Sequence, residues 1–94
     1  MSMELADIVI SLSGRDAGKR FLVVALQDEY SLIADGKGRR IESPKRKKNK
    51  HLKFEEKADS PIADKLKDGE KVTNNDIRRF FAQYAADRIA AGGM

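Results

Sequence analysis

Two apolar segments, residues 8–12 and 21–26, flank a short polar segment that has glycine near both of its ends. This segment reads Gly14-Arg15-Asp16-Ala17-Gly18-Lys19. Glycine adopts the positive φ values of tight turns, and apolar runs rich in Val and Ile between turn signals are typical of strands. The pattern therefore predicts two strands joined by a compact turn, and it commits the N-terminal half of the chain to a β-sheet.

Three further short strands are predicted downstream, over residues 30–34, 40–42 and 51–54. The Asp35-Gly36-Lys37-Gly38 run is a strong turn signal after the first of these strands. Pro44 ends the second of them, because proline cannot donate a hydrogen bond to a ladder. Five short strands within residues 6–54 favour a small SH3-like β-barrel.

A helical extension is predicted over residues 60–91, after a charged linker at 55–59. Ser60 and Pro61 are suited to the start of a short helix that ends at Gly69. A longer helix follows, with Thr73 or Asn74 as its cap. Its apolar side chains recur every three or four positions, namely Ile77, Phe80, Phe81, Tyr84, Ala85 and Ile89.

The second strand, residues 20–26, is apolar at consecutive positions, so both of its faces need cover. We expect the aromatic stripe of the last helix to pack on the barrel and to cover one face. A helix kept for self-association would show the same pattern. The last residues, 90–94, are expected to fray.

Positive charge is concentrated in the middle of the chain. Its formal charge is +4, but residues 37–53 alone hold nine Lys and Arg side chains and one acid, Glu42, which makes +8 there. A focused positive field attracts polyanions. The tract from Lys45 to His51 is predicted to be a loop that stays mobile until phosphates neutralise it.

Residues 6–19 resemble the KOW motif of ribosomal and transcription-elongation proteins, in which an Asp-x-Val-x-Val strand leads into a Ser-Gly-x-x-x-Gly-Lys turn. The continuation through Phe21-Leu22-Val23-Val24 to Leu32-Ile33-Ala34-Asp35-Gly36 resembles the large-subunit ribosomal protein family called fourteen-e. The resemblance covers residues 6–54 and fits a bacterial KOW-domain protein. It implies an SH3-like barrel that binds RNA, often ribosomal, through its loops and basic residues.

The sequence therefore predicts a non-enzymatic RNA-binding domain, with ribosomal RNA and the ribosome as the expected partners. The candidate RNA-binding residues are Arg15, Lys19, Arg20, Lys37, Arg39, Arg40, Lys45, Arg46, Lys47, Lys48, Lys50 and His51. Only Tyr30, Phe21 and Phe54 could stack on bases, and each is expected in the core. We therefore expect recognition of RNA shape and backbone rather than of base sequence.

Other functions find less support in the composition. The chain has no Cys and one His, so neither a disulfide nor a transition-metal site is expected, and no cofactor is predicted. No residue pattern pairs a nucleophile with a base, so an enzyme is not expected. The longest apolar run, residues 21–26, is too short for a membrane span, and the start lacks a signal peptide, which predicts a cytoplasmic protein.

A protein-interaction module is the alternative. SH3-like barrels also bind peptides, and the aromatic stripe of the last helix could dock on a protein partner or on a second copy of the chain. Such a module would suit a transcription- or translation-associated factor.

Overall fold

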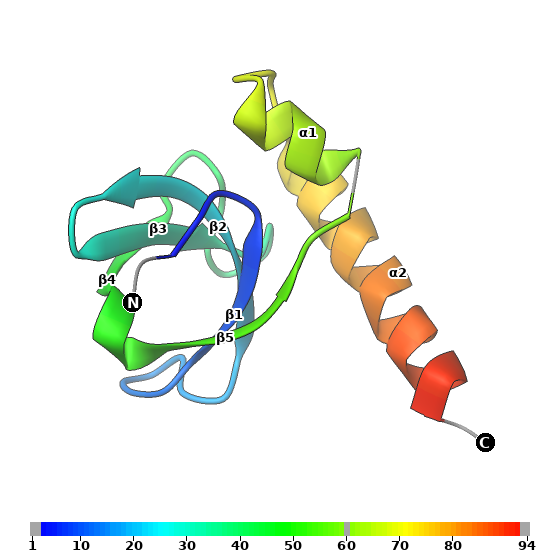
Figure 1. The fold of residues 1–94 in the computed structure, drawn as a ribbon, viewed down its shortest axis with the longest axis horizontal. Helices are drawn as coiled ribbons and strands as arrows, with labels where there is room; N and C mark the ends of the chain where they lie inside the picture. Colours follow the sequence, from blue (N-terminus) through cyan, green and yellow to red (C-terminus); the bar gives the residue numbers. More distant parts are fainter. Residues whose placement is uncertain (1–2, 60, 93–94) are drawn as a thin grey trace.

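A computed structural model describes residues 3–59 and 61–92. Five strands precede two helices (Figure 1). The elements are β1 (Asp7–Ser11), β2 (Arg20–Gln27), β3 (Tyr30–Ala34), β4 (Lys45–Lys48), the 3-10 turn η1 (Asn49–His51), β5 (Leu52–Lys57), α1 (Ile62–Lys67) and α2 (Asn74–Gly92). In the described ranges, neither helix has the length and apolar character to cross a membrane.

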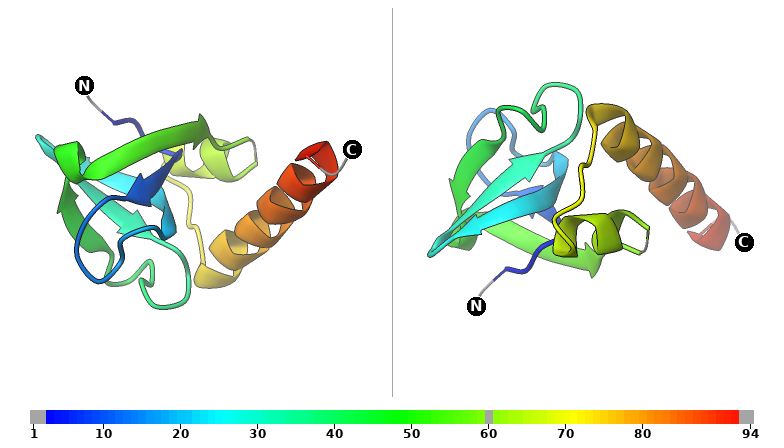
Figure 2. Two further views of the ribbon diagram at one scale, coloured as in Figure 1. Left: turned by 90° about the horizontal axis from the view of Figure 1, so that it is seen from below. Right: turned by 90° about the horizontal axis from the view of Figure 1, so that it is seen from above.

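The strands form one antiparallel sheet in the order β4-β3-β2-β1-β5. This confirms the prediction of a small, mostly β protein with five strands and a helical C-terminal segment. The two edge strands, β4 and β5, are joined through the three residues of η1 alone. The sheet is therefore strongly curved, and its edges approach each other (Figures 1 and 2).

Each face of the curved sheet has its own apolar cluster. The concave cluster contains Met3, Val9, Phe21, Val23, Ile33 and Leu52. The convex cluster contains Ile8, Leu22 and Ala34 from the strands, together with Ile62, Ala63, Ile77 and Tyr84 from the helices. Alternate residues of one strand point to opposite faces, so consecutive apolar residues of β2 contribute to both clusters.

The first correction concerns the basic tract. Residues 40–42 form no strand; the fourth strand is Lys45–Lys48, within the tract predicted to be a mobile loop. Its register pairs Ile33 with Lys45 and Tyr30 with Lys48. Lysine is well tolerated at a sheet edge, where its stem lies along the sheet and its charge stays in water. The strand was therefore not predicted, because its residues show no apolar alternation.

The second correction concerns the fifth strand and the linker after it. His51 belongs to η1, and β5 begins at Leu52 and continues to Lys57, so most of the predicted linker at 55–59 is part of the sheet. A register shift against β1 lies between Ile8, which pairs with Glu56, and Val9, which pairs with Phe54. Within this extended strand, Glu55 is paired with Arg20 of β2 and with Tyr84 of α2.

The helix boundaries follow local signals. Gly69, with φ of 74°, lies just beyond the C-cap of α1, where a left-handed residue is common. At the start of α2, the Thr73 Oγ1 atom accepts from the Asp76 N–H at 3.0 Å, and the Thr73 N–H donates to the Asp76 carboxylate at 3.0 Å. This reciprocal pair identifies Thr73 as the cap. Helix α2 includes residues 90–92, which were expected to fray; residues 93–94 and the predicted cap Ser60 lie outside the described residues.

Helix α2 uses its N-terminal half to cover the convex face of the sheet (Figure 2). Ile77 is fully buried and Tyr84 is 9% exposed, while Phe80 and Phe81 pack at the border of the convex cluster. Phe80 and Tyr84 stack at 6.0 Å between ring centroids. Most of the aromatic stripe is therefore used within the molecule, whereas Ile89, further along the helix, is 74% exposed.

Candidate nucleic-acid interface

The β1–β2 loop is a compact turn built on two left-handed glycines, Gly14 at φ 77° and Gly18 at φ 85°. The Gly18 N–H donates to the Ser11 carbonyl at 2.7 Å, and the Lys19 N–H donates to the Asp16 carbonyl at 2.9 Å. These bonds fold the loop on itself and leave Arg15 and Lys19 exposed at its surface.

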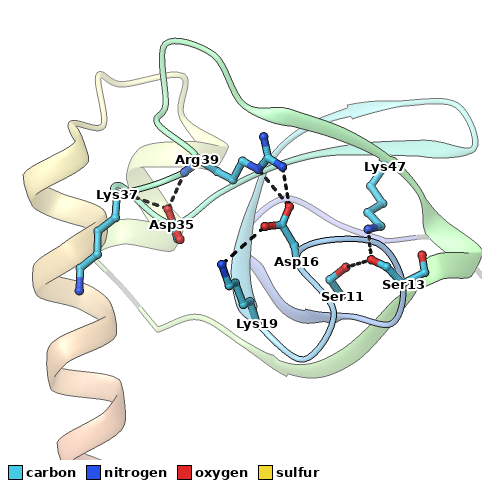
Figure 3. Close-up of polar contacts among 8 residues, drawn as sticks. All are labelled: Ser11, Ser13, Asp16, Lys19, Asp35, Lys37, Arg39 and Lys47. Atoms are coloured by element: carbon cyan, nitrogen blue, oxygen red, sulfur yellow. Dashed lines mark hydrogen bonds and ion pairs between the residues drawn. The ribbon is translucent and has the colours of Figure 1, made fainter.

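Asp16 joins this loop to the β3–β4 loop (Figure 3). Its carboxylate accepts from Arg39 Nε at 3.0 Å and from Arg39 Nη2 at 2.8 Å, and Lys19 Nζ lies 3.9 Å away. Burial alone would raise the pKa of the Asp16 carboxyl group, but the hydrogen bonds and charge of Arg39, with the charges of Lys19 and Lys47, outweigh it and lower the pKa. Asp16 thus holds two predicted RNA-binding side chains together and neutralises part of their charge.

The β3–β4 loop is held by its own hydrogen bonds and by a contact with α2. The Asp35 carboxylate accepts from the Lys37 and Arg39 N–H groups, both at 2.9 Å (Figure 3). At the helix, Arg78 Nη1 donates to the Gly36 carbonyl at 2.6 Å. Gly36 has φ of 80°, and a Cβ atom there would lie 2.6 Å from the Asn74 carbonyl oxygen, so only glycine fits. Exposed Lys37 is therefore carried by a loop that is anchored to α2.

Strand β4 brings cations to both faces of the sheet edge. Lys47 extends to the β1–β2 loop, where its Nζ donates to the Ser13 carbonyl at 2.6 Å (Figure 3). On the opposite face, the Arg46 guanidinium carbon lies 3.7 Å from the centroid of the Tyr30 ring, and Lys48 Nζ lies 5.9 Å from it. Two groups of cations, one around the β1–β2 loop and one around Tyr30, therefore meet along β4.

Arg20 stands apart from these groups. It makes a two-pronged ion pair with Glu55, at 2.7 Å from Nε and 3.0 Å from Nη2, beneath α2. Its guanidinium carbon also lies 5.5 Å from the centroid of the Tyr84 ring. The hydrogen bond to Glu55 raises the pKa of Arg20 above its ordinary value. Arg20 therefore links the sheet to the helix, and it lines a pocket beside α2 together with Lys37, another predicted site residue.

Glu55 also accepts a hydrogen bond from the Tyr84 hydroxyl at 2.6 Å. Burial would raise the pKa of Glu55, but its bonds to Arg20 and Tyr84 outweigh burial and lower it. Burial, followed by the hydrogen bond to Glu55 and the charge of Glu55, raises the pKa of Tyr84 to about 12. This buried polar cluster was not predicted, because Glu55 was assigned to a linker.

The remaining predicted residues lie on exposed loops, on β4 and on η1: Arg15, Lys37, Arg40, Lys45, Lys50 and His51. Within residues 3–59 and 61–92, no carboxylate lies within 4.0 Å of the charged nitrogens of Arg15, Lys37, Arg40, Lys45 or Lys50. The side chain of His51 is half-buried, and its carbonyl accepts from the Leu12 N–H at 2.9 Å. The positive charge of the loops and of β4 is therefore largely uncompensated within the described chain.

The three aromatic candidates differ in exposure. Phe21 is fully buried in the concave cluster, as predicted. Phe54 is 44% exposed, so its assignment to the core was wrong. Tyr30 is half-buried beneath Arg46.

In the described part of the chain, no three acidic or histidine side chains are grouped so that they could hold a metal ion. No protein-family model and no curated protein sequence matches this chain. Its function must therefore be inferred from its own residues and their geometry.

Proposed function

We propose that this protein is a non-enzymatic RNA-binding domain of the SH3-like KOW type. In this proposal the curved sheet closes into a small barrel, and the cations of the β1–β2 loop, the β3–β4 loop and β4 bind the sugar-phosphate backbone of RNA. Structured RNA, ribosomal RNA first, is the proposed partner.

One observation carries the proposal: β4 holds four consecutive cations at the edge of the sheet. Lys45, Arg46 and Lys48 are exposed and Lys47 is half-buried. None of the four makes an ion pair with a carboxylate within the ranges that the structure describes. Neighbouring charges on a strand repel one another, and a polyanion laid across them would relieve that repulsion and release its own counterions.

Two contacts support closure of the barrel. The Leu12 N–H, at the end of β1, donates to the His51 carbonyl of η1 at 2.9 Å. This bond extends the pairing of β1 with the edge strand β5 by one step. Lys47 of the opposite edge strand, β4, reaches the Ser13 carbonyl of the β1–β2 loop at 2.6 Å. The second contact brings β4 to the part of the sheet where β1 and β5 pair, which is the approach that closure requires.

Docking of a protein on the aromatic stripe receives less support. Tyr84 is 9% exposed and donates to Glu55 at 2.6 Å, so the stripe is engaged with the sheet. On the basic edge, by contrast, Lys45, Arg46 and Lys48 are exposed and make no ion pair within the described residues.

The test is a charge reversal on β4 that spares Lys47, whose contact with Ser13 belongs to the fold. In the wild-type protein, about five phosphate contacts predict that log K falls with log salt concentration at a slope of roughly −3.5 to −4.5. Replacing Lys45, Arg46 and Lys48 by Glu removes three of these contacts, so the slope should become shallower by about 2 to 3 units and affinity should fall. Filter binding to a structured ribosomal RNA fragment at several salt concentrations measures both quantities.

A matched control reverses three exposed cations on the helical side, Lys67, Lys71 and Arg79. It changes the net charge by the same amount but should leave the salt slope near its wild-type value. Far-UV circular dichroism checks that both triple variants fold. Equal losses of RNA affinity in the two variants, or no loss of affinity in the β4 variant, would rule out β4 as the binding site.

A further inference from the structure

A flat cationic surface lies on the convex face of β3 and β4. The antiparallel register pairs Tyr30 with Lys48 and Leu32 with Arg46, so these four side chains share one face of the sheet. The Arg46 guanidinium lies on the Tyr30 ring with its carbon 3.7 Å from the centroid, which is the contact distance for stacking. Figures 1 and 2 place β4 on the side of the sheet away from α2.

The Arg46 guanidinium is supported by Tyr30 on one side and remains accessible to solvent on the other. It is planar, so one face rests on Tyr30 while the other faces solvent, since Arg46 is exposed. Its backbone is fixed by pairing with Leu32, and Tyr30 is half-buried and paired with Lys48. The outer face of Arg46 is therefore a preformed platform, because the tyrosine has already restricted the side chain.

The charge of this platform is available to a ligand. For residues 3–59 and 61–92, no carboxylate lies within ion-pairing distance of Arg46 or Lys48. Arg39 shows the contrast, because its guanidinium is occupied by Asp16 at 2.8 Å. An arginine backed by an aromatic ring and lacking an acidic partner retains both its charge and its π-face.

The pairing of a flat face with a neighbouring ammonium group suits a nucleotide better than a plain polyanion. A nucleobase stacks on a guanidinium plane, and the phosphate next to it attracts the Lys48 ammonium. An acidic side chain would meet the charges but would leave the flat face unused. Bases in an RNA duplex are closed to such contact, so the ligand must present an unpaired base.

We propose that Tyr30, Arg46 and Lys48 form a stacking site for one unpaired base of single-stranded or looped RNA. The base lies on the outer face of Arg46, Tyr30 supports that side chain from below, and Lys48 contacts an adjacent phosphate. The site rests on the proposed RNA-binding function and extends it from attraction of the backbone to contact with a base. Stacking of this kind tolerates any base, so it adds affinity without reading sequence.

The test compares two ligands with equal numbers of phosphates: an oligouridine and an abasic oligomer of the same length. One stacked base should make the wild-type protein prefer the oligouridine by at least about fivefold. Arg46→Lys keeps the charge but removes the plane, so the preference should fall to nearly one while the salt slope stays unchanged. Tyr30→Leu should reduce the preference in the same way, since Arg46 loses its support.

The matched control is Arg79→Lys, the same substitution at an exposed arginine of α2, outside the proposed RNA-binding surface. It should keep the full preference for the oligouridine. If wild-type protein binds both oligomers equally and with a steep salt slope, the stacking site is wrong while the RNA-binding proposal stands. If it binds neither oligomer nor structured RNA, the RNA-binding proposal itself fails. Full preference in Arg46→Lys would also overturn the site.

Discussion

At the scale of single residues, partners decide what each charge does. Lys19, Arg20 and Arg39 all looked alike as candidates for phosphate contacts, yet Arg20 is occupied by Glu55 and Arg39 by Asp16. The partners are 35 and 23 positions away along the chain. The sequence shows that a cation is present, but the fold determines whether a carboxylate reaches it. The left-handed glycines of the β1–β2 loop were predictable, because their conformation depends on local geometry.

We predict that Asp16→Asn weakens the contact with Arg39 that connects the β1–β2 loop to the β3–β4 loop. The pKa of Asp16 is lower in the folded protein than its ordinary value of 3.8, so its carboxylate stabilises the fold fully above about pH 4 and loses this effect as the pH falls through the folded value. At pH 7 the variant should lose about 1 kcal/mol of unfolding free energy, since Arg39 is partly exposed to solvent screening. Urea unfolding at pH 7 and at pH 3 measures this difference, which should shrink at the lower pH.

Asp28→Asn is the control for this comparison. Asp28 is exposed, and its φ of 55° suits asparagine as well as aspartate. Its unfolding free energy should match that of the wild-type protein at both pH values. A loss in Asp16→Asn that is equally large at pH 3 would mean that the carboxylate charge is not the cause.

At the scale of elements, the errors of prediction fall at the sheet edges. Strands β1, β2 and β3 were predicted from apolar residues that fill the two clusters. Strand β4 carries only Lys and Arg, so it shows no apolar signal of a strand. Strand β5 was predicted only in its first half, over residues 51–54, because its second half is Glu55-Glu56-Lys57. Backbone pairing to β3 and β1 stabilises these edges, and that pairing depends on segments distant in sequence.

Helix α2 gives a second prediction, which concerns alkaline pH. The pKa of Tyr84 is raised from 10.0 to about 12, so the stabilisation that Tyr84 provides is complete below pH 10 and is lost as the pH rises towards 12. Absorbance at 295 nm should show one phenol ionising near pH 12 in the folded protein. Tyr84→Phe should remove this step and cost about 1 kcal/mol of unfolding free energy at pH 7, because Glu55 loses one donor.

Tyr30→Phe is the matched control for Tyr84. It removes the other tyrosine hydroxyl of the chain while keeping the ring beneath Arg46. The step near pH 12 must persist in this variant. If the step disappears from Tyr30→Phe and stays in Tyr84→Phe, the contact of Tyr84 with Glu55 does not govern the high pKa.

At the scale of the whole molecule, positive charge is concentrated in one segment of the chain. Residues 37–53 carry a formal charge of +8 in a chain of +4, so the remainder is acidic. This division was predictable from the sequence alone, because it needs only counting. The presence of an apolar cluster on each face of the sheet was also predictable in outline, since β2 is apolar on both sides. The sequence did not show that these cations lie on an edge strand, because that depends on the pairing of β4 with β3.

Because its positive charge is largely uncompensated, the folded protein should gain stability from added salt. Repulsion within the basic segment destabilises the folded state and is screened by salt. The unfolding free energy of the wild-type protein should therefore rise between 20 mM and 300 mM salt. The triple Glu variant of Lys45, Arg46 and Lys48 should be the more stable protein at 20 mM and should respond less to salt. Urea unfolding at both concentrations tests this, and a larger salt response in the variant would contradict it.

The contact between Gly36 and Asn74 restricts how this molecule can be re-engineered. Beside Gly36 there is no room for a methyl group, because a Cβ atom there would lie 2.6 Å from the Asn74 carbonyl oxygen in the first turn of α2. A loop grafted in place of residues 35–44 must therefore keep a glycine at that point, or the helix start must be redesigned with it. Substitutions at Arg15, which is exposed on the β1–β2 loop, meet no such restriction.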